Sequence, residues 1–96
     1  STFLEDLHMA DSKTTPITNP NPRVTEAGGL EWLPGETKQI DGATIRGSRW
    51  IAWALSVGVL VGTKADVLAT AVDGLSKEDA ATFAKGEIGA LLASIA

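Results

Sequence analysis

The sequence predicts a mainly α-helical protein with an extended, proline-rich N-terminal arm and one short β-hairpin. Three of the four prolines lie within residues 12–29, whereas a large share of the apolar side chains lies after Trp50. Residues 50–63 hold no charged side chain, and sequence patterns that start helices recur after them. We therefore divide the chain into three parts: a short helix and extended arm (1–29), a turn-rich segment or hairpin (30–47), and an apolar helical region (48–96).

The N-terminal part begins with an amphipathic pattern and continues as an arm. Phe3, Leu4 and Leu7 recur at near-helical spacing, so we expect a short helix over residues 2–11. A helix of that length is marginal by itself in water, so docking on something else would have to order it. Residues 12–29 then combine prolines with a Gly-Gly pair, a composition that breaks both helix and sheet. They form either a disordered tail or an arm that becomes ordered across a neighbouring subunit.

The hairpin is predicted around the pair Asp41-Gly42. Two short runs, residues 37–40 and 43–46, flank this pair. Asp-Gly favours a type I′ turn, because both central positions of that turn need a positive φ. An isolated hairpin is barely stable, so we expect it to rest on the helices or on a partner.

Capping patterns place the helices of the C-terminal part. Thr63 and Ser76 are each followed three residues later by an aspartate, as in N-terminal capping boxes, and Gly74 suits a helix stop between them. Gly86 and Gly89 weaken the last helix, so packing must hold it. The sequence thus predicts an apolar helix at about 48–62, a short helix at about 64–73 and an amphipathic helix at about 77–95.

The most apolar stretch, residues 49–62, has three interpretations. It is a helix buried in a small bundle or an assembly, a tilted transmembrane span over about 50–72, or a reversible interfacial helix. A helix over 50–63 is about 21 Å long, against a hydrocarbon core of about 30 Å. A longer span would place Lys64 and Asp66 at membrane depth. The buried helix is therefore favoured.

We expect this helix and its neighbours to form an interface. Ala54, Gly58 and Gly62 recur every four residues, a small-residue row that lets two helix backbones approach closely. Tryptophans anchor both cores and interfaces; core packing is the commoner role and interface anchoring the other. The candidate interface residues are Trp32, Trp50, Trp53, Ala54, Gly58, Gly62, Phe83, Leu91 and Leu92.

Catalysis, cofactors and metals are not indicated by the sequence. Cysteine is absent and His8 is the only histidine; it shares a helical face with Glu5 and Asp11, but one such face lacks the second motif of helical metal sites. No nucleophile elbow or phosphate-binding glycine loop is present. The eight basic residues are scattered and the net charge is −4, so nucleic-acid binding is not expected. Acidic residues interrupt the first apolar side chains, so we expect no signal peptide.

These observations predict a small non-enzymatic structural or accessory subunit that becomes ordered within a larger assembly. A minor virion or capsid-associated component and an accessory subunit of a membrane complex both fit. The alternative is a small integral membrane protein, holin-like or anchoring, with a single span over about 50–72. A third hypothesis is an autonomous soluble helical binding domain. The expected partners are other protein subunits; contact with a membrane and the cellular compartment are left open.

Overall fold

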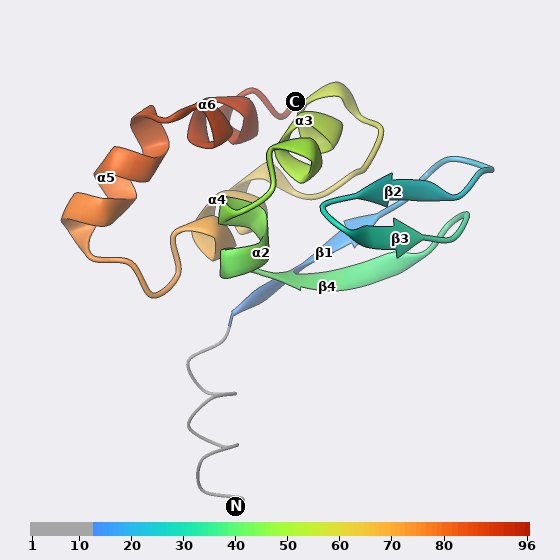
Figure 1. Cartoon of the computed structure of the whole chain (residues 1–96), viewed down its shortest axis with the longest axis horizontal. Coiled ribbons are helices and arrows are strands. Elements are labelled where there is room, and N and C mark those ends of the chain that lie inside the picture. The colour runs from blue at the N-terminus through green and yellow to red at the C-terminus, as the bar shows by residue number, and fades with distance from the viewer. Residues whose placement is uncertain (1–12) are drawn as a thin grey trace, which may run out of the picture.

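The computed structural model describes residues 13–96 and combines helices with two small antiparallel sheets (Figure 1). About 45% of these residues are helical and 20% lie in strands, so the chain is mixed α/β and the predicted mainly α class is wrong. The helix expected over 2–11 lies outside the described residues. The elements are β1 (Thr14–Thr18), β2 (Thr25–Ala27), β3 (Leu30–Trp32), β4 (Thr37–Asp41), α2 (Gly42–Arg46), α3 (Arg49–Val57), α4 (Lys64–Ala71), α5 (Lys77–Lys85) and α6 (Glu87–Ala93).

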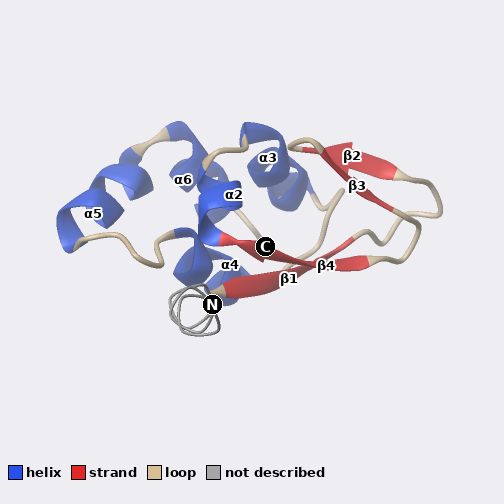
Figure 2. Ribbon diagram, turned by 60° about the horizontal axis from the view of Figure 1, so that its bottom comes forward, coloured by secondary structure: helices blue, strands red, loops and turns tan. Residues whose placement is uncertain are grey.

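Each of the two sheets has two strands, and the strands of one lie between the strands of the other in the sequence. Strand β1 pairs with β4, with Thr15 opposite Ile40, and the chain between them forms the β2–β3 hairpin. Figure 2 shows β2 and β3 at one end of the molecule and α5 at the other. Part of the predicted arm, residues 14–18, is therefore a strand of this chain's own sheet.

The turn predicted at Asp41-Gly42 is a helix start instead. Asp41 ends β4, and its Oδ1 accepts a hydrogen bond of 2.8 Å from the Thr44 amide, which caps α2. Residues 43–46, the expected second strand, are helical. A tight hairpin turn with two positive φ values does occur, but between β2 and β3. There Gly28 and Gly29 have φ values of 60° and 77°.

The apolar stretch is not one long helix. Helix α3 ends at Val57 because Gly58 adopts a left-handed conformation, with φ 85°. The chain then turns back, and Val61 forms an antiparallel bridge with Thr18 through two hydrogen bonds of 2.9 Å. Gly58 and Gly62 consequently do not share a helix face, and the predicted small-residue row does not form. Within residues 13–96, no helix has the length and apolar character to cross a bilayer.

The last predicted helix is divided in two. Ser76 caps α5, as expected, by accepting a hydrogen bond of 3.0 Å from the Asp79 amide. Gly86 then takes an extended conformation and separates α5 from α6. A side chain at Gly89 would collide with the carbonyl oxygen of Phe83, so glycine lets the two helices bend closely together.

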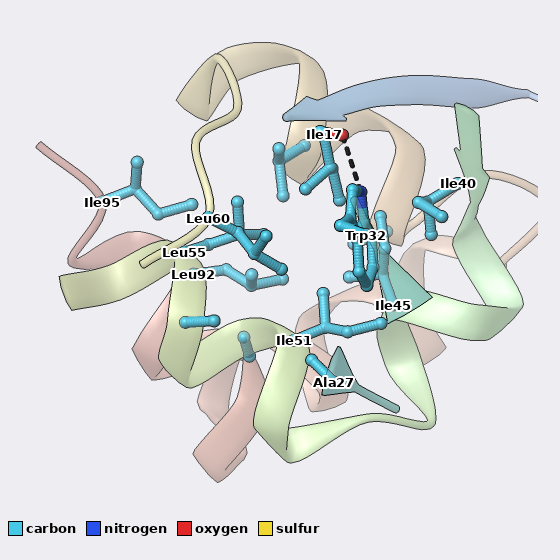
Figure 3. Packing of buried hydrophobic residues seen from close by; sticks show 14 residues of the cluster. Ile17, Ala27, Trp32, Ile40, Ile45, Ile51, Leu55, Leu60, Leu92 and Ile95 are labelled. Carbon is cyan, nitrogen blue, oxygen red and sulfur yellow. Dashed lines mark hydrogen bonds between the residues drawn. The ribbon is translucent and has the colours of Figure 1, made fainter. Parts of the chain in front are cut away.

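The core is centred on Trp32 (Figure 3). Its indole is fully buried, and Nε1 donates a hydrogen bond of 2.9 Å to the carbonyl oxygen of Ile17. The core thus removes the apolar surface of the indole from water, and the hydrogen bond gives its one polar atom a partner. Other fully buried side chains around this core are Ile17, Ile45, Ile51, Leu60, Val67 and Leu92.

A buried amide organises the loops beside the sheets. Asn19 is fully buried, and its Oδ1 accepts hydrogen bonds from the amide of Asn21 at 3.0 Å and the hydroxyl of Thr25 at 3.2 Å. All of its side-chain hydrogen-bonding capacity is in use, as a buried amide requires. Its Nδ2 donates to the carbonyl oxygens of Arg23 at 2.8 Å and of Trp32 and Leu33 at 3.2 Å each.

The carboxyl group of Glu36 makes the stability of the β3–β4 turn depend on pH. The amide of Leu33 donates to Glu36 Oε1 at 2.8 Å and, with Lys38 nearby, holds the pKa of this carboxyl below its usual value. A carboxyl with a lowered pKa stabilises the fold above its unfolded pKa, and that contribution disappears as the pH falls through the folded value.

We expect Glu36→Gln to lower the urea midpoint of unfolding modestly at about pH 7, because glutamine keeps an acceptor for the Leu33 amide but loses the charge. The difference from the original protein should shrink as the pH is lowered towards about 3. Urea titrations followed by circular dichroism at several pH values would measure it. A difference that stays constant with pH would mean that the charge plays no part.

Candidate functional site

Helix α3 is apolar on two opposite sides. Its inner side carries Ile51 and Leu55, which are buried in the core, and Ser48 fixes the helix start by accepting a hydrogen bond of 3.1 Å from the Ile51 amide. The other side carries Trp50, Trp53 and Val57, which are 64%, 44% and 55% exposed. These three residues, spaced over two turns, are called the outer face of α3 below. Large apolar side chains clustered in this way on a surface mark an interaction site more often than scattered ones do.

The two exposed tryptophans form an ordered pair. The ring centroids of Trp50 and Trp53 lie 6.2 Å apart at an interplanar angle of 80°, an edge-to-face arrangement. Aromatic rings favour this geometry because the positive edge of one ring meets the negative face of the other. The contact therefore favours one relative arrangement of the two indoles on the outer face of α3.

An acidic hollow of about 540 Å³ lies beside Trp50 and is formed by the β2–β3 hairpin. Glu26 and Glu31 both line it and are directly opposite each other in the strand register. No ion pair within residues 13–96 engages either of them, whereas the neighbouring Arg49 is paired with Glu87 at 2.7 Å. The outer face of α3 therefore borders on uncompensated negative charge.

The position of the hollow relative to α3 is fixed by close packing at the hairpin turn. A side chain at Gly28 would come within 2.6 Å of Ser48 Oγ and 2.8 Å of Ile51 Cδ1. Only glycine lets the turn lie this close to the first turn of α3 and also adopt its positive φ. The backbone of the hairpin that carries Glu26 and Glu31 thus has a set position relative to the first turn of α3.

A second hollow, of about 410 Å³, is almost entirely apolar and is called the α4–α6 groove. Helix α5 forms one wall and contributes Phe83, which is only half-buried; no residue of α5 is fully buried. An apolar helix side that finds so little cover within the described residues is incompletely packed. The groove is lined by Leu68, Ala69, Val72, Phe83, Ala84, Gly89 and Ala93.

The predicted interface residues do not form one surface. Trp50 and Trp53 lie together on the outer face of α3, whereas Trp32, Ala54 and Leu92 are buried in the core. The remaining four are distributed over other regions: Gly58 is exposed at the end of α3, Gly62 packs beside Val67, Phe83 lines the α4–α6 groove, and Leu91 is half-buried.

Sequence reasoning missed Val57 and the two glutamates beside Trp50. Val57 could have been found, because it follows Trp50 by seven residues and so shares its helix face. The approach of Glu26 and Glu31 to Trp50 depends on the packing of the hairpin against α3, which no local pattern contains.

Neither side-chain chemistry nor comparison assigns an activity to this chain. Among residues 13–96, no group of histidine, aspartate or glutamate side chains is arranged to hold a metal ion. The face of Glu5, His8 and Asp11 considered above lies outside the described residues. Comparison with protein-family models, curated proteins and solved structures finds no match to this chain.

Proposed function

We propose that the protein is a small non-enzymatic subunit that docks into a larger assembly through the outer face of α3. The observation that carries this proposal is the exposure of Trp50 and Trp53 as an ordered pair on a helix whose other side is buried. Tryptophans contribute more to protein interfaces than most residues, especially when they reach the water-free centre of the contact. A minor virion or capsid component and an accessory subunit of a membrane complex both remain suitable settings.

The proposed partner protein has a surface that complements the charge around Trp50. Glu26 and Glu31 line the adjacent hollow without an ion pair, and the chain has a net charge of −4. A partner with an apolar pocket for the indoles and lysine or arginine side chains at its rim would complement this surface. Like charges on the partner would be repelled, so the glutamates contribute to specificity.

The core around Trp32 supports a protein that folds before it docks. Within residues 13–96, fourteen apolar side chains form one buried cluster. The same observation favours a second candidate function, an autonomous binding domain that would use the outer face of α3 transiently. The lifetime of the complex separates the two candidates.

The double substitution Trp50→Ala and Trp53→Ala should abolish incorporation into the native assembly. Each indole at the centre of an interface contributes at least about 2 kcal/mol, or roughly 30-fold in affinity. Because both side chains are exposed, the urea midpoint should stay close to that of the unchanged protein. The measurement is the amount of tagged protein that co-purifies with its assembly from the native source.

A matched control removes two other exposed apolar side chains. Val24 and Leu33 are 48% and 54% exposed, and neither lies on α3. The double substitution Val24→Ala and Leu33→Ala should leave incorporation unchanged. If the tryptophan variant is incorporated as well as this control, the outer face of α3 is not the docking surface.

A further inference from the structure

We propose that the side of β4 that faces away from β1, called the β4 edge below, pairs with the β4 edge of a second copy of this chain. The two strands would run antiparallel about a two-fold axis at Gln39, and the two β1–β4 pairs would become one four-stranded sheet. This inference is independent of the outer face of α3, which lies on another element. It rests on the backbone groups of the β4 edge, on the contrast with the edge of β1, and on the register that the charges favour.

The backbone groups of Thr37 and Gln39 point away from β1. In an antiparallel pair, residues that exchange two backbone hydrogen bonds alternate with residues that exchange none. Thr18, which lies opposite Thr37, makes both of its backbone hydrogen bonds with Val61 instead, at 2.9 Å each. Two residues along, Gln39 lies opposite Pro16, which has no N–H to donate. Both Thr37 and Gln39 therefore lie outside the β1–β4 ladder of hydrogen bonds.

These outward groups have no partner in the part of the chain that the structure describes. Within residues 13–96, no hydrogen bond beyond the ladder engages the backbone N–H or C=O of Thr37 or Gln39, and β1 is the one strand paired with β4. Both residues are exposed. A hollow of about 440 Å³, lined by residues 38–41 and by Leu30 of β3, lies beside the strand. An open row of donors and acceptors of this kind is a template for another strand.

The corresponding edge of β1 is closed, which makes the open edge of β4 distinctive. On β1, Pro16 offers no donor and Thr18 is already bridged to Val61. On β4, the register with β1 is continuous without a bulge, and the strand contains no proline. Its one lysine, Lys38, lies 3.5 Å from a carboxylate oxygen of Glu36, so its charge is partly neutralised. The devices that commonly keep an edge strand single are therefore weak here.

A second copy of the chain complements this edge. Each outward residue offers one donor and one acceptor, so an antiparallel copy presents the matching groups, as a two-fold interface requires. Gln39 is the middle residue of β4. Centring the pair there lets Gln39 exchange two hydrogen bonds with Gln39 of the second copy and places Lys38 opposite Ile40. Centring it on Lys38 would place two lysines directly opposite each other, which is destabilising.

Introduced cysteines test this register, and the chain has no cysteine of its own. In the proposed pair, the Cα atoms of Gln39 and its copy lie about 5.5 Å apart, which suits a disulfide. Thr37 and its copy lie four residue steps apart along the strands, about 13 Å, which is too far. Gln39→Cys should therefore form a disulfide-linked dimer at least about tenfold faster than the matched control Thr37→Cys under mild oxidation. Both positions are exposed on the same strand.

A second pair of variants tests the backbone hydrogen bonds themselves. Gln39→Pro removes the outward N–H, whereas Gln39→Ala removes the same side chain but keeps that N–H. Urea titration checks that both variants keep the fold, since Gln39 contributes no hydrogen bond to the β1–β4 ladder. Sedimentation equilibrium of the full chain up to about 1 mM measures the dissociation constant of the dimer. We expect Gln39→Pro to raise it at least about tenfold and Gln39→Ala by less than about threefold.

Three results would overturn the proposal. The first is an unchanged protein that remains a monomer of 10.0 kDa at about 1 mM. The second is an equal rate of disulfide formation for Gln39→Cys and Thr37→Cys, which decides the question alone if Gln39→Pro does not fold. The third is a dimer that persists in Gln39→Pro but is lost when Trp50 and Trp53 are both replaced by alanine, because that dimer would use the outer face of α3.

Discussion

Trp32→Ala should lower the free energy of unfolding by about 3–5 kcal/mol, a cost typical of removing a large aromatic side chain from a core. The indole is fully buried, and its Nε1 satisfies the carbonyl oxygen of Ile17. The substitution would leave a cavity at the centre of the core and one buried carbonyl without its donor. Small domains are stable by only about 5–15 kcal/mol, so a large part of the protein's stability would be lost.

Urea unfolding followed by circular dichroism would measure this effect, with Trp50→Ala as the matched control. Both substitutions remove one indole, but Trp50 is 64% exposed and its loss should change the free energy of unfolding by less than about 0.5 kcal/mol. Equal midpoints for the two variants would mean that the core is not organised around Trp32.

Asn19→Ala should be the second most damaging single change, at roughly 2–4 kcal/mol, because each buried polar group left without a partner costs about 1–3 kcal/mol. The substitution removes the donor shared by three carbonyl oxygens and the acceptor for Asn21 and Thr25. The same urea titration measures it.

Two further variants separate the hydrogen bonds of Asn19 from its volume. Asn19→Asp keeps the shape but points carboxylate oxygens at the carbonyls of Arg23, Trp32 and Leu33, so it should be as harmful as alanine at neutral pH. Asn21→Ala removes only two side-chain donations, to Asn19 and to the Val59 carbonyl, and should cost less. If Asn19→Asp is as stable as the original protein, the amide donations contribute nothing.

The local signals in the sequence predicted helix starts better than they predicted strands. Ser76 caps α5 because the capping interaction joins residues three positions apart, and such an interaction can be recognised from spacing alone. Asp41 shows the limit of this kind of inference. An Asp-Gly pair serves a tight turn or a helix start equally well, and the pairing of β4 with the distant β1 leaves the helix start as the outcome here.

Gly58 shows the same limit within the apolar stretch. A glycine in an apolar run is compatible with a continuous helix, and the sequence alone favoured one. The bridge between Val61 and Thr18 requires the chain to turn back before that point, and glycine permits the left-handed residue that the turn needs. Contacts between residues this far apart in the chain decide the fold, and no window of neighbouring residues contains them.

Only part of the candidate site could be predicted from the sequence, because the sequence does not show which tryptophans are exposed. The exposure of Trp50 and Trp53 agrees with their selection as interface residues, and their role in binding stays a prediction. Trp32 was selected on the same grounds but is buried. Residue type alone does not distinguish these cases, because tryptophan stabilises cores and interfaces through the same apolar surface.

The distance along the chain between β1 and its partners has a consequence for synthesis on the ribosome. At about 5–20 residues per second, Val61 is made a few seconds after Thr18, and β1 has no partner strand until β4 has emerged. During that interval an unpaired strand is open to pairing with other nascent chains. Pro16, within β1, offers no backbone donor for such pairing, and Pro20 and Pro22 prevent the strand from lengthening. The prolines that resemble a disordered arm in the sequence thus limit the pairing that β1 can make before its partners are available.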